Sequence, residues 1–123
     1  MKRILVVEDE PSISQVCVRT LASEGFLVDT AANGLVAQGK LLQKDYDLIL
    51  IDVRTPLMNG KQLYHHISEK HPELVSRIVF TTGDVLGSDT QHFIGDTGCL
   101  HLPKPFAPSA LRAKVKEALS RQK

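Results

Sequence analysis

The chain has 123 residues, 42% hydrophobic and 24% charged, which is an ordinary composition for a globular protein with one core. Its formal net charge of +1 argues against a global attraction to nucleic acid or to membranes. No apolar stretch approaches the roughly 20 residues that span a bilayer, and the N-terminal apolar run is too short for a signal peptide. We therefore predict one domain over residues 1–123, in the cytoplasm, with no nucleic-acid or membrane partner.

The first half of the chain alternates between short apolar runs and helical patterns. Continuous apolar runs are typical of strands that are buried on both faces of a parallel sheet. Pro11 suits the first turn of a helix, where its missing N–H costs little, and Gly25 suits a helix end. In chain order we expect a strand at 3–7, a helix from Pro11 to Gly25, a strand at 26–31 and a helix from Gly34 to Gln43.

The second half repeats this alternation. A loop at 55–60 contains Pro and Gly and separates a strand from a helix. The segment at 88–96 is only weakly helical, because it has few apolar anchors. In chain order we expect a strand at 47–51, a helix from Gly60 to just before Pro72, a strand at 77–81, a helix at 88–96, a strand at 99–102 and a last helix with its stripe at Leu111, Val115, Ala118 and Leu119.

Alternating strands and helices predict an α/β fold, a parallel sheet with helices on both faces. Right-handed crossovers leave few topologies, of which we favour the flavodoxin-like, doubly wound order 2-1-3-4-5 for five strands. Ligands of such sheets bind at the carboxyl ends of the strands, near the switch point between strands one and three. This order places Glu8, Asp9 and Asp52 together.

The polar residues at the strand ends predict a site for a divalent metal ion and an anion. Crowded carboxylates repel one another unless a cation joins them. Oxygen ligands without Cys or His favour Mg²⁺, Mn²⁺ or Ca²⁺ over zinc, and we expect Mg²⁺, with Mn²⁺ as an alternative. Asp52 is then a candidate nucleophile, since carboxylates form aspartyl phosphates. Thr82 can donate its hydroxyl to a phosphoryl oxygen, and Lys104 can neutralise another or pair with Asp52 when no phosphoryl group is present.

These motifs together resemble the receiver domain of two-component signalling over essentially the whole chain. The matching pieces share an order, a spacing and a placement at strand ends. They are the acidic pair Glu8-Asp9, then Asp52 with Pro56, Met58 and Gly60 after it, then Thr82-Gly83, and finally Lys104-Pro105-Phe106. The segments around Thr82 and Lys104 look most like receivers attached to hybrid histidine kinases.

The resemblance implies a role for each matching residue. Asp52 would be the phosphoacceptor, supplied by a sensor histidine kinase or a histidine phosphotransfer domain. Asp9 and Glu8 would bind Mg²⁺ with Asp52, and Arg54 would offer its backbone carbonyl. Thr82 would be the switch hydroxyl and Lys104 the phosphate-binding lysine. The domain would signal through phosphorylation and would not be a stand-alone enzyme.

One position departs from the pattern of the family. Three residues before the lysine the family usually has Phe or Tyr, which moves inward with the threonine, whereas this chain has His101. An imidazole is smaller and can carry charge, so we expect a weaker switch. We expect the responding surface to comprise the fourth helix, the fifth strand and the fifth helix.

Two other functions stay open on the residues alone. The first is a protein-interaction module, or a phosphate sink, that keeps the fold without a phosphorylation switch, and only His101 favours it. The second is a flavin protein, which the acidic turn after the first strand disfavours because it would repel the FMN phosphate.

Several residues outside the motifs have a structural and a functional interpretation. Cys17 and Cys99 lack metal-ligand spacing and are interpreted as buried free thiols in a reducing compartment. We expect His65, His66 and His71 to face solvent and not to bind metal. Residues 103–123 carry six basic residues and one acidic residue. These cations either stabilise the C-terminal end of a helix or form a face that docks a partner. Arg54 and Asp84 either gate the site as an ion pair or are simply solvated.

Overall fold

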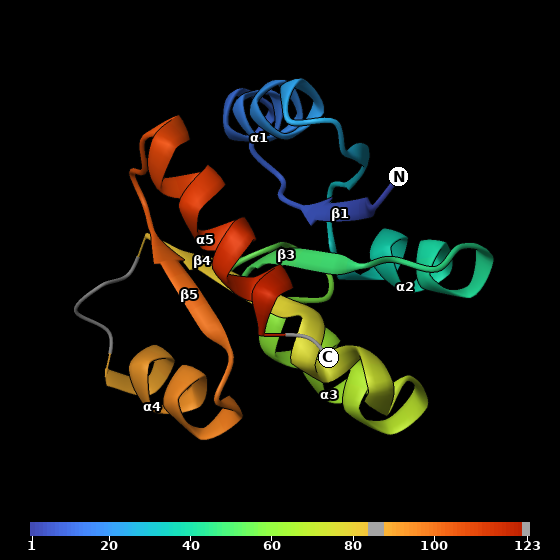
Figure 1. Cartoon of the computed structure of the whole chain (residues 1–123). Helices are drawn as coiled ribbons and strands as arrows, with labels where there is room; N and C mark the ends of the chain where they lie inside the picture. Colours follow the sequence, from blue (N-terminus) through green and yellow to red (C-terminus); the bar gives the residue numbers. More distant parts are fainter. Residues whose placement is uncertain (84–87, 122–123) are drawn as a thin grey trace.

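The computed structural model describes residues 1–83 and 88–121 and contains one five-stranded parallel sheet. Its order is β2-β1-β3-β4-β5, which confirms the predicted flavodoxin-like topology (Figure 1). The strands are β1 at Arg3–Val7, β2 at Leu27–Ala31, β3 at Leu48–Asp52, β4 at Ile78–Thr82 and β5 at Leu100–Pro103. The crossovers between them are helical, as parallel neighbours require.

The helices follow the predicted alternation, with one addition. They are α1 at Pro11–Ser23, α2 at Gly34–Gln43, α3 at Gly60–Lys70, η1 at Pro72–Arg77, α4 at Ser88–Thr97 and α5 at Pro108–Ser120. The 3₁₀ helix η1 was not expected, because Pro72 was interpreted only as the end of α3. Proline also suits the first turn of a new helix, and η1 begins with it.

Strands β2 to β5 each begin one residue later than the sequence predicts, and β3 to β5 also end one residue later. The ladder continues to the polar residues, since Asp52 pairs with Thr81 and Thr82 pairs with Pro103. Asp52 and Thr82 are therefore the last residues of β3 and β4 and not the first residues of loops. Ladder hydrogen bonds hold their backbones in place.

Two apolar cores lie on opposite faces of the sheet. Leu5 and Ile49 point into the core that α2, α3, η1 and α4 cover, whereas Ile4 and Leu48 point into the core under α1 and α5. Successive side chains of a strand alternate between faces, so a strand with helices on both sides is apolar at every position. This explains why β3 is buried along its whole length.

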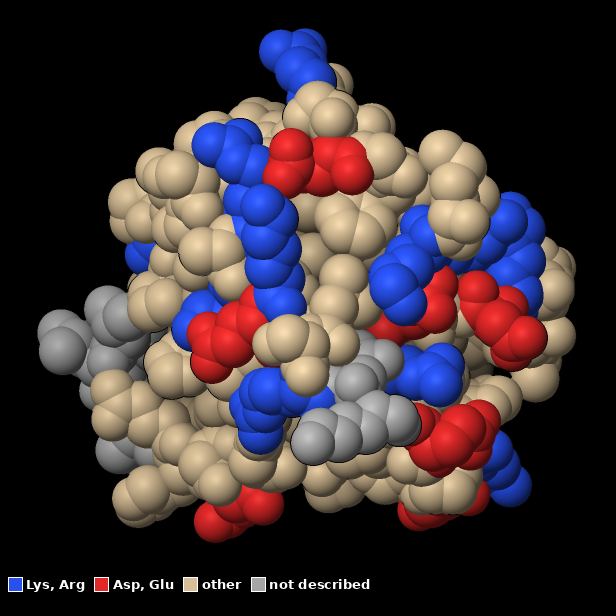
Figure 2. Space-filling model, viewed as in Figure 1, with Lys and Arg blue, Asp and Glu red and all other residues tan. Residues whose placement is uncertain are grey.

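The surface carries interspersed charges of both signs. Figure 2 shows Lys and Arg beside Asp and Glu on the viewed face. In the C-terminal segment, Lys114 Nζ lies 3.3 Å from Glu117 Oε1, and Lys116 Nζ lies 3.6 Å from Glu24 Oε1 at the end of α1. These contacts offset part of the basic charge of α5. In the described ranges, no helix has the length and apolar character needed to cross a membrane.

The cysteines and histidines differ in part from expectation. Cys17 is buried and Cys99 is half-buried, and both are free thiols. His65 is exposed, but His66 and His71 are only partly exposed, so the prediction that all three face solvent was wrong. The packing of the end of α3 against η1 and of α2 against α3 encloses them, and sequence patterning gave no signal of this packing.

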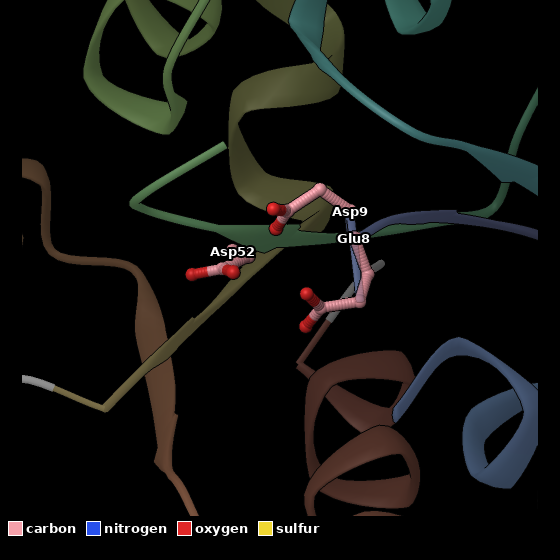
Figure 3. A group of neighbouring side chains, drawn as sticks. All are labelled: Glu8, Asp9 and Asp52. Carbon is pink, nitrogen blue, oxygen red and sulfur yellow. The ribbon is translucent and has the colours of Figure 1, made fainter. Parts of the chain in front are cut away.

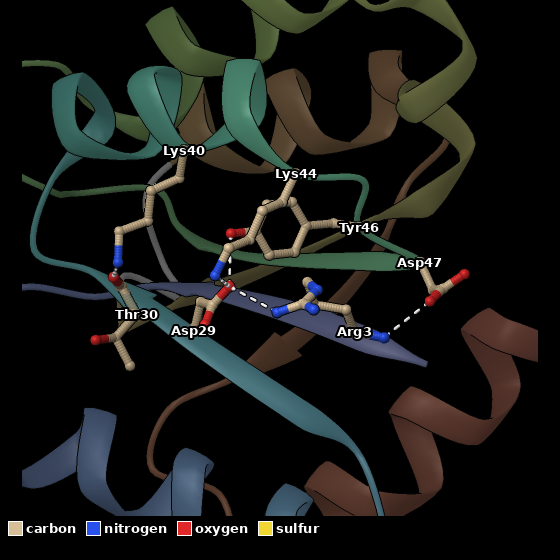
Figure 4. Close-up of polar contacts among 7 residues, drawn as sticks. All are labelled: Arg3, Asp29, Thr30, Lys40, Lys44, Tyr46 and Asp47. Atoms are coloured by element: carbon tan, nitrogen blue, oxygen red, sulfur yellow. Dashed lines mark hydrogen bonds and ion pairs between the residues drawn. The ribbon is translucent and has the colours of Figure 1, made fainter. Parts of the chain in front are cut away.

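A polar network ties the β2 edge of the sheet to its neighbours (Figure 4). The hydroxyl of buried Tyr46 donates to Asp29 Oδ2 at 2.8 Å, and Arg3 and Lys44 each place a cationic nitrogen 3.4 Å from the same oxygen. Burial by itself raises the pKa of Asp29, but these donors outweigh it and hold the pKa below the usual 3.8. The ionised carboxylate therefore stabilises the folded state.

The network yields a prediction for Tyr46→Phe, which removes only the hydroxyl. Near pH 7 we expect the free energy of unfolding in urea to fall by about 1–2 kcal/mol, because a hydrogen bond to a charged group is lost. Asp29 has a lowered folded-state pKa, so its contribution is present above the unfolded value and is lost as the pH falls through the folded value. The difference from wild type should accordingly shrink below about pH 4.

Tyr64→Phe is the matched control, since its hydroxyl makes no hydrogen bond to any residue that the structure describes. A pH-independent loss in Tyr46→Phe, or an equal loss in both variants, would contradict the role of Asp29.

Candidate functional site

Three carboxylates meet at the carboxyl ends of β1 and β3 (Figure 3). Glu8 and Asp9 follow β1 directly, and Asp52 ends β3. One oxygen from each lies within 4.8 Å of the others. Glu8 and Asp52 are only 6% and 5% exposed, whereas Asp9 is open to solvent. The structure thus brings together the three acids of the predicted site and leaves one side accessible.

Lys104, in the loop after β5, is the cation of this cluster. Its Nζ lies 2.6 Å from Glu8 Oε1 and 3.0 Å from Asp52 Oδ2. Its backbone N–H donates to the carbonyl of Thr82 at 2.8 Å, which fixes the loop against the end of β4. The sequence predicts pairing with Asp52 but not with Glu8. The second contact arises because the sheet order places the end of β1 beside that of β3 and opposite the β5 loop.

Burial and charge set the protonation of Glu8 and Lys104. Burial raises the pKa of Glu8 above its usual 4.5, the nearby charge of Asp52 adds to this, and bonds from Lys104 and from the Glu10 backbone offset part of it. Burial lowers the pKa of Lys104, but its contacts with Glu8 and Asp52 outweigh that effect and raise the pKa above 10.5. The ammonium therefore stays charged and compensates two buried acids.

The loop after β3 orients Asp52. The backbone N–H of Arg54 donates to Asp52 Oδ1 at 3.1 Å, so the two carboxylate oxygens have different partners. The loop turns back sharply, and Gly60 N–H donates to the carbonyl of Val53 at 2.9 Å. A Cβ on Gly60 would lie 2.7 Å from Val53 Cα, so this close approach requires glycine. The sequence alone gave no signal for the contact from Arg54.

The two predicted switch residues lie in different surroundings. Thr82 is 4% exposed at the end of β4, next to the loop that carries Lys104. His101 is exposed on β5, opposite Phe80 in the strand register. Asp84, the proposed gate partner of Arg54, lies outside the described residues.

The donor set fits a hard divalent cation. Carboxylate oxygens suit Mg²⁺ or Mn²⁺, and the cluster of Glu8, Asp9 and Asp52 contains no imidazole or thiolate. The exposed position of Asp9 leaves room for the several water ligands that Mg²⁺ retains. A buried nucleophilic carboxylate, a lysine and a hydroxyl beside a cation site form a pocket suited to phosphorylation of an aspartate.

Comparison with known families agrees with this chemistry. The family described as "Response regulator receiver domain" matches residues 4–116. The chain belongs to this family. A receiver domain is a signalling module and not a stand-alone enzyme.

Similar receiver domains occur in longer proteins of different kinds. The "Sensor kinase CckA" of Brucella abortus is 32% identical over 97% of this chain, which covers 13% of that protein. The "Transcriptional regulatory protein CpxR homolog" of Haemophilus influenzae is 34% identical over 98% of this chain, which covers 52% of that protein. The chain therefore spans about half or less of these relatives, and they include both a kinase and a transcriptional regulator.

A solved structure shares both the fold and the sequence family. The response regulator TrrA from Thermotoga maritima, in complex with Mg(2+)-BeF, is 32% identical with a TM-score of 0.82. The match covers 97% of this chain and 100% of that chain.

The contacts of Lys104 predict competition between its ammonium and a metal ion. Lys104→Met removes a cation that lies 2.6 Å and 3.0 Å from two of the acids. We expect Mg²⁺ affinity, measured by calorimetry, to rise roughly tenfold or more, because the acids then repel one another without compensation. Stability without metal should fall for the same reason.

Two variants calibrate this measurement. Lys116→Met removes a well-exposed cation of α5 and should leave Mg²⁺ affinity unchanged. Asp9→Asn should weaken Mg²⁺ binding. Its free energy of unfolding should change by no more than about 0.5 kcal/mol, because Asp9 is exposed. Weaker Mg²⁺ binding in Lys104→Met would show that the lysine does not compete for the acids.

Proposed function

We propose that residues 1–123 form one receiver domain that accepts a phosphoryl group on Asp52. The observation that carries this proposal is the position of the Asp52 carboxylate, which clusters with Glu8 and Asp9 and lies 3.0 Å from Lys104 Nζ. The donor would be a phosphohistidine of a sensor histidine kinase or a histidine phosphotransfer domain. An Asp52 oxygen attacks phosphorus, the P–N bond to the histidine breaks, and the electron pair leaves on the imidazole.

The surrounding residues would each act on a different part of the phosphoryl group. Glu8, Asp9, Asp52 and the backbone carbonyl of Arg54 would hold Mg²⁺ or Mn²⁺. The charge of the ion would neutralise phosphoryl oxygens. Lys104 would move from the acids to a phosphoryl oxygen, which carries more negative charge than the carboxylate it leaves. Thr82 would donate its hydroxyl to another oxygen. The relative solved with Mg(2+)-BeF supports this choice of cation.

The wider setting is also a proposal. The kinase relative supports a receiver attached to a hybrid histidine kinase. We place the domain in the cytoplasm, with kinase and effector proteins as partners and with no membrane or nucleic acid bound by these residues. The low net charge supports the last point.

Asp52→Asn tests the acceptor. With Mg²⁺ and acetyl phosphate or phosphoramidate, wild type should gain one phosphoryl group, about 80 Da by intact-mass spectrometry. Asp52→Asn should gain none, since an amide is not a nucleophile of this kind. Asp45→Asn removes an exposed acid outside the pocket and should label like wild type. Equal labelling of Asp52→Asn would place the acceptor elsewhere.

A second prediction concerns the response to phosphorylation at α4, β5 and α5. Thr82 precedes the segment that leads to α4, and Lys104 Nζ reaches the acids from the end of β5, so both are mechanically linked to that surface. Amide chemical shifts of residues 88–102 should therefore change on addition of beryllofluoride and Mg²⁺. Because His101 is exposed and its ring is smaller than that of Phe or Tyr, we expect the change to be modest.

His101→Phe provides the matched variant for this experiment. An apolar ring gains more from turning inward, so the chemical-shift changes in His101→Phe should be larger than in wild type. Changes confined to the pocket loops in both proteins would contradict the switch. That result would favour a phosphate sink, and no labelling of wild type at all would favour a phosphate-independent interaction module.

A further inference from the structure

Two histidine rings lie together at the end of α3, far from the acidic pocket. His66 belongs to α3 and His71 is its C-cap, with ring centroids 5.9 Å apart and ring planes at 65°. Helix α3 begins beside Val53 near the pocket and runs away from it for 11 residues, about 16 Å. The pair is therefore separate from Glu8, Asp9 and Asp52.

Each ring has one nitrogen without a partner. The Nε2 atoms of His66 and His71 are buried, and neither has a hydrogen bond to any described residue. A buried polar atom that lacks a partner costs about 1–3 kcal/mol, so such atoms are rare and usually have a ligand or a water. Two of them on neighbouring rings require a common explanation.

A side-chain contact restrains the ring of His66, and backbone hydrogen bonds restrain the main chain of His71. Gln38 on α2 places its side-chain nitrogen 3.2 Å from His66 Nδ1, so Nδ1 accepts a hydrogen bond and Nε2 carries the ring proton. For Nε2 to bind metal, the Gln38 amide turns over so that its oxygen accepts from Nδ1–H, and the lone pair then lies on Nε2. A histidine that binds metal usually donates its other ring N–H to an oxygen, and the turned Gln38 amide would supply that oxygen. The His71 backbone donates to Ile67 and accepts from Leu74, so the second ring starts from a rigid turn.

We propose that His66 and His71 bind one transition-metal cation through their Nε2 atoms, with Zn²⁺ as the representative ion. Two imidazoles on a tetrahedral ion, with Zn–N bonds of about 2 Å, place their ring centroids about 5 Å apart. The observed 5.9 Å is reached from that value by a shift of less than about 1 Å. Water would complete the coordination, and the partial exposure of both residues leaves a route for the ion.

The charge state of the pair suits this ligand. Burial lowers the pKa of His66, the charges of His71 and Lys70 lower it further, and Glu69 opposes them. Neutral imidazole is the form that binds metal, so protons compete weakly at neutral pH. Imidazole nitrogens also favour Zn²⁺, Ni²⁺ and Cu²⁺ over Mg²⁺, which separates this site from the carboxylate pocket.

The test is a calorimetric Zn²⁺ titration of the full chain at pH 7.5 with excess Mg²⁺, alongside NMR of the histidine rings. We expect one Zn²⁺ per chain, with shifts confined to the His66 and His71 rings. His66→Gln and His71→Gln should each weaken binding by at least about tenfold, and Gln38→Leu by about tenfold. His65→Gln, on the same helix but exposed, should bind like wild type.

Circular dichroism of each variant shows whether the fold is retained, and Gln38→Leu still tests the site if a histidine variant unfolds. Loss of the Zn²⁺ signal in Asp9→Asn with retention in both histidine variants would place the ion in the acidic pocket and overturn the proposal. Absence of binding in wild type would also overturn it and would assign the two nitrogens to a buried water.

Discussion

The contact between one ammonium and two buried carboxylates is the interaction on which the functional end of this protein depends. Lys104 reaches Glu8 and Asp52 from a loop more than fifty residues further along the chain than Asp52. Without a cation, two acids buried at one sheet edge would repel each other and raise each other's pKa values. The lysine relieves this repulsion when the pocket holds no metal. It also means that any divalent cation entering the pocket must share the acids with Lys104.

Burial raises the pKa of two carboxylates of this domain, but their different partners shift the net pKa values in opposite directions. Asp29 at the β2 edge has three donors around one oxygen, and its pKa is lowered. Glu8 at the sheet rim has one lysine and one backbone donor, and its pKa is raised. The first acid has enough donors to stay ionised, and its contacts stabilise the fold. The second acid has fewer donors than burial requires, so a bound cation would stabilise its ionised form.

The sheet supplies the rigidity that such a pocket needs. β3 is buried on both faces, and the ladder extends to Asp52 itself. The Arg54 amide and the tight Gly60 turn then fix the loop that follows. Thr82 and Lys104 are joined through the backbone, so movement of one is passed to the other and to β5. A phosphoryl group on Asp52 would act on a surface through these few contacts.

The sequence by itself determined the order of elements, the sheet topology and the acidic site, because apolar runs, helical stripes and strand-end residues are local signals. Residues Glu8, Asp9, Asp52, Thr82 and Lys104 were predicted this way, and the structure brings the three acids and Lys104 together. The sequence did not predict η1, and it placed the ends of β3 to β5 one residue too early. Hydrogen bonds to neighbouring strands decide where a ladder stops, and these are not visible in a local pattern. Only the tertiary structure decided that Lys104 pairs with Glu8, that Asp29 is enclosed by three donors and that His66 meets His71. Those contacts join segments whose approach is set by packing, and packing depends on the shapes of whole elements and not on any local pattern.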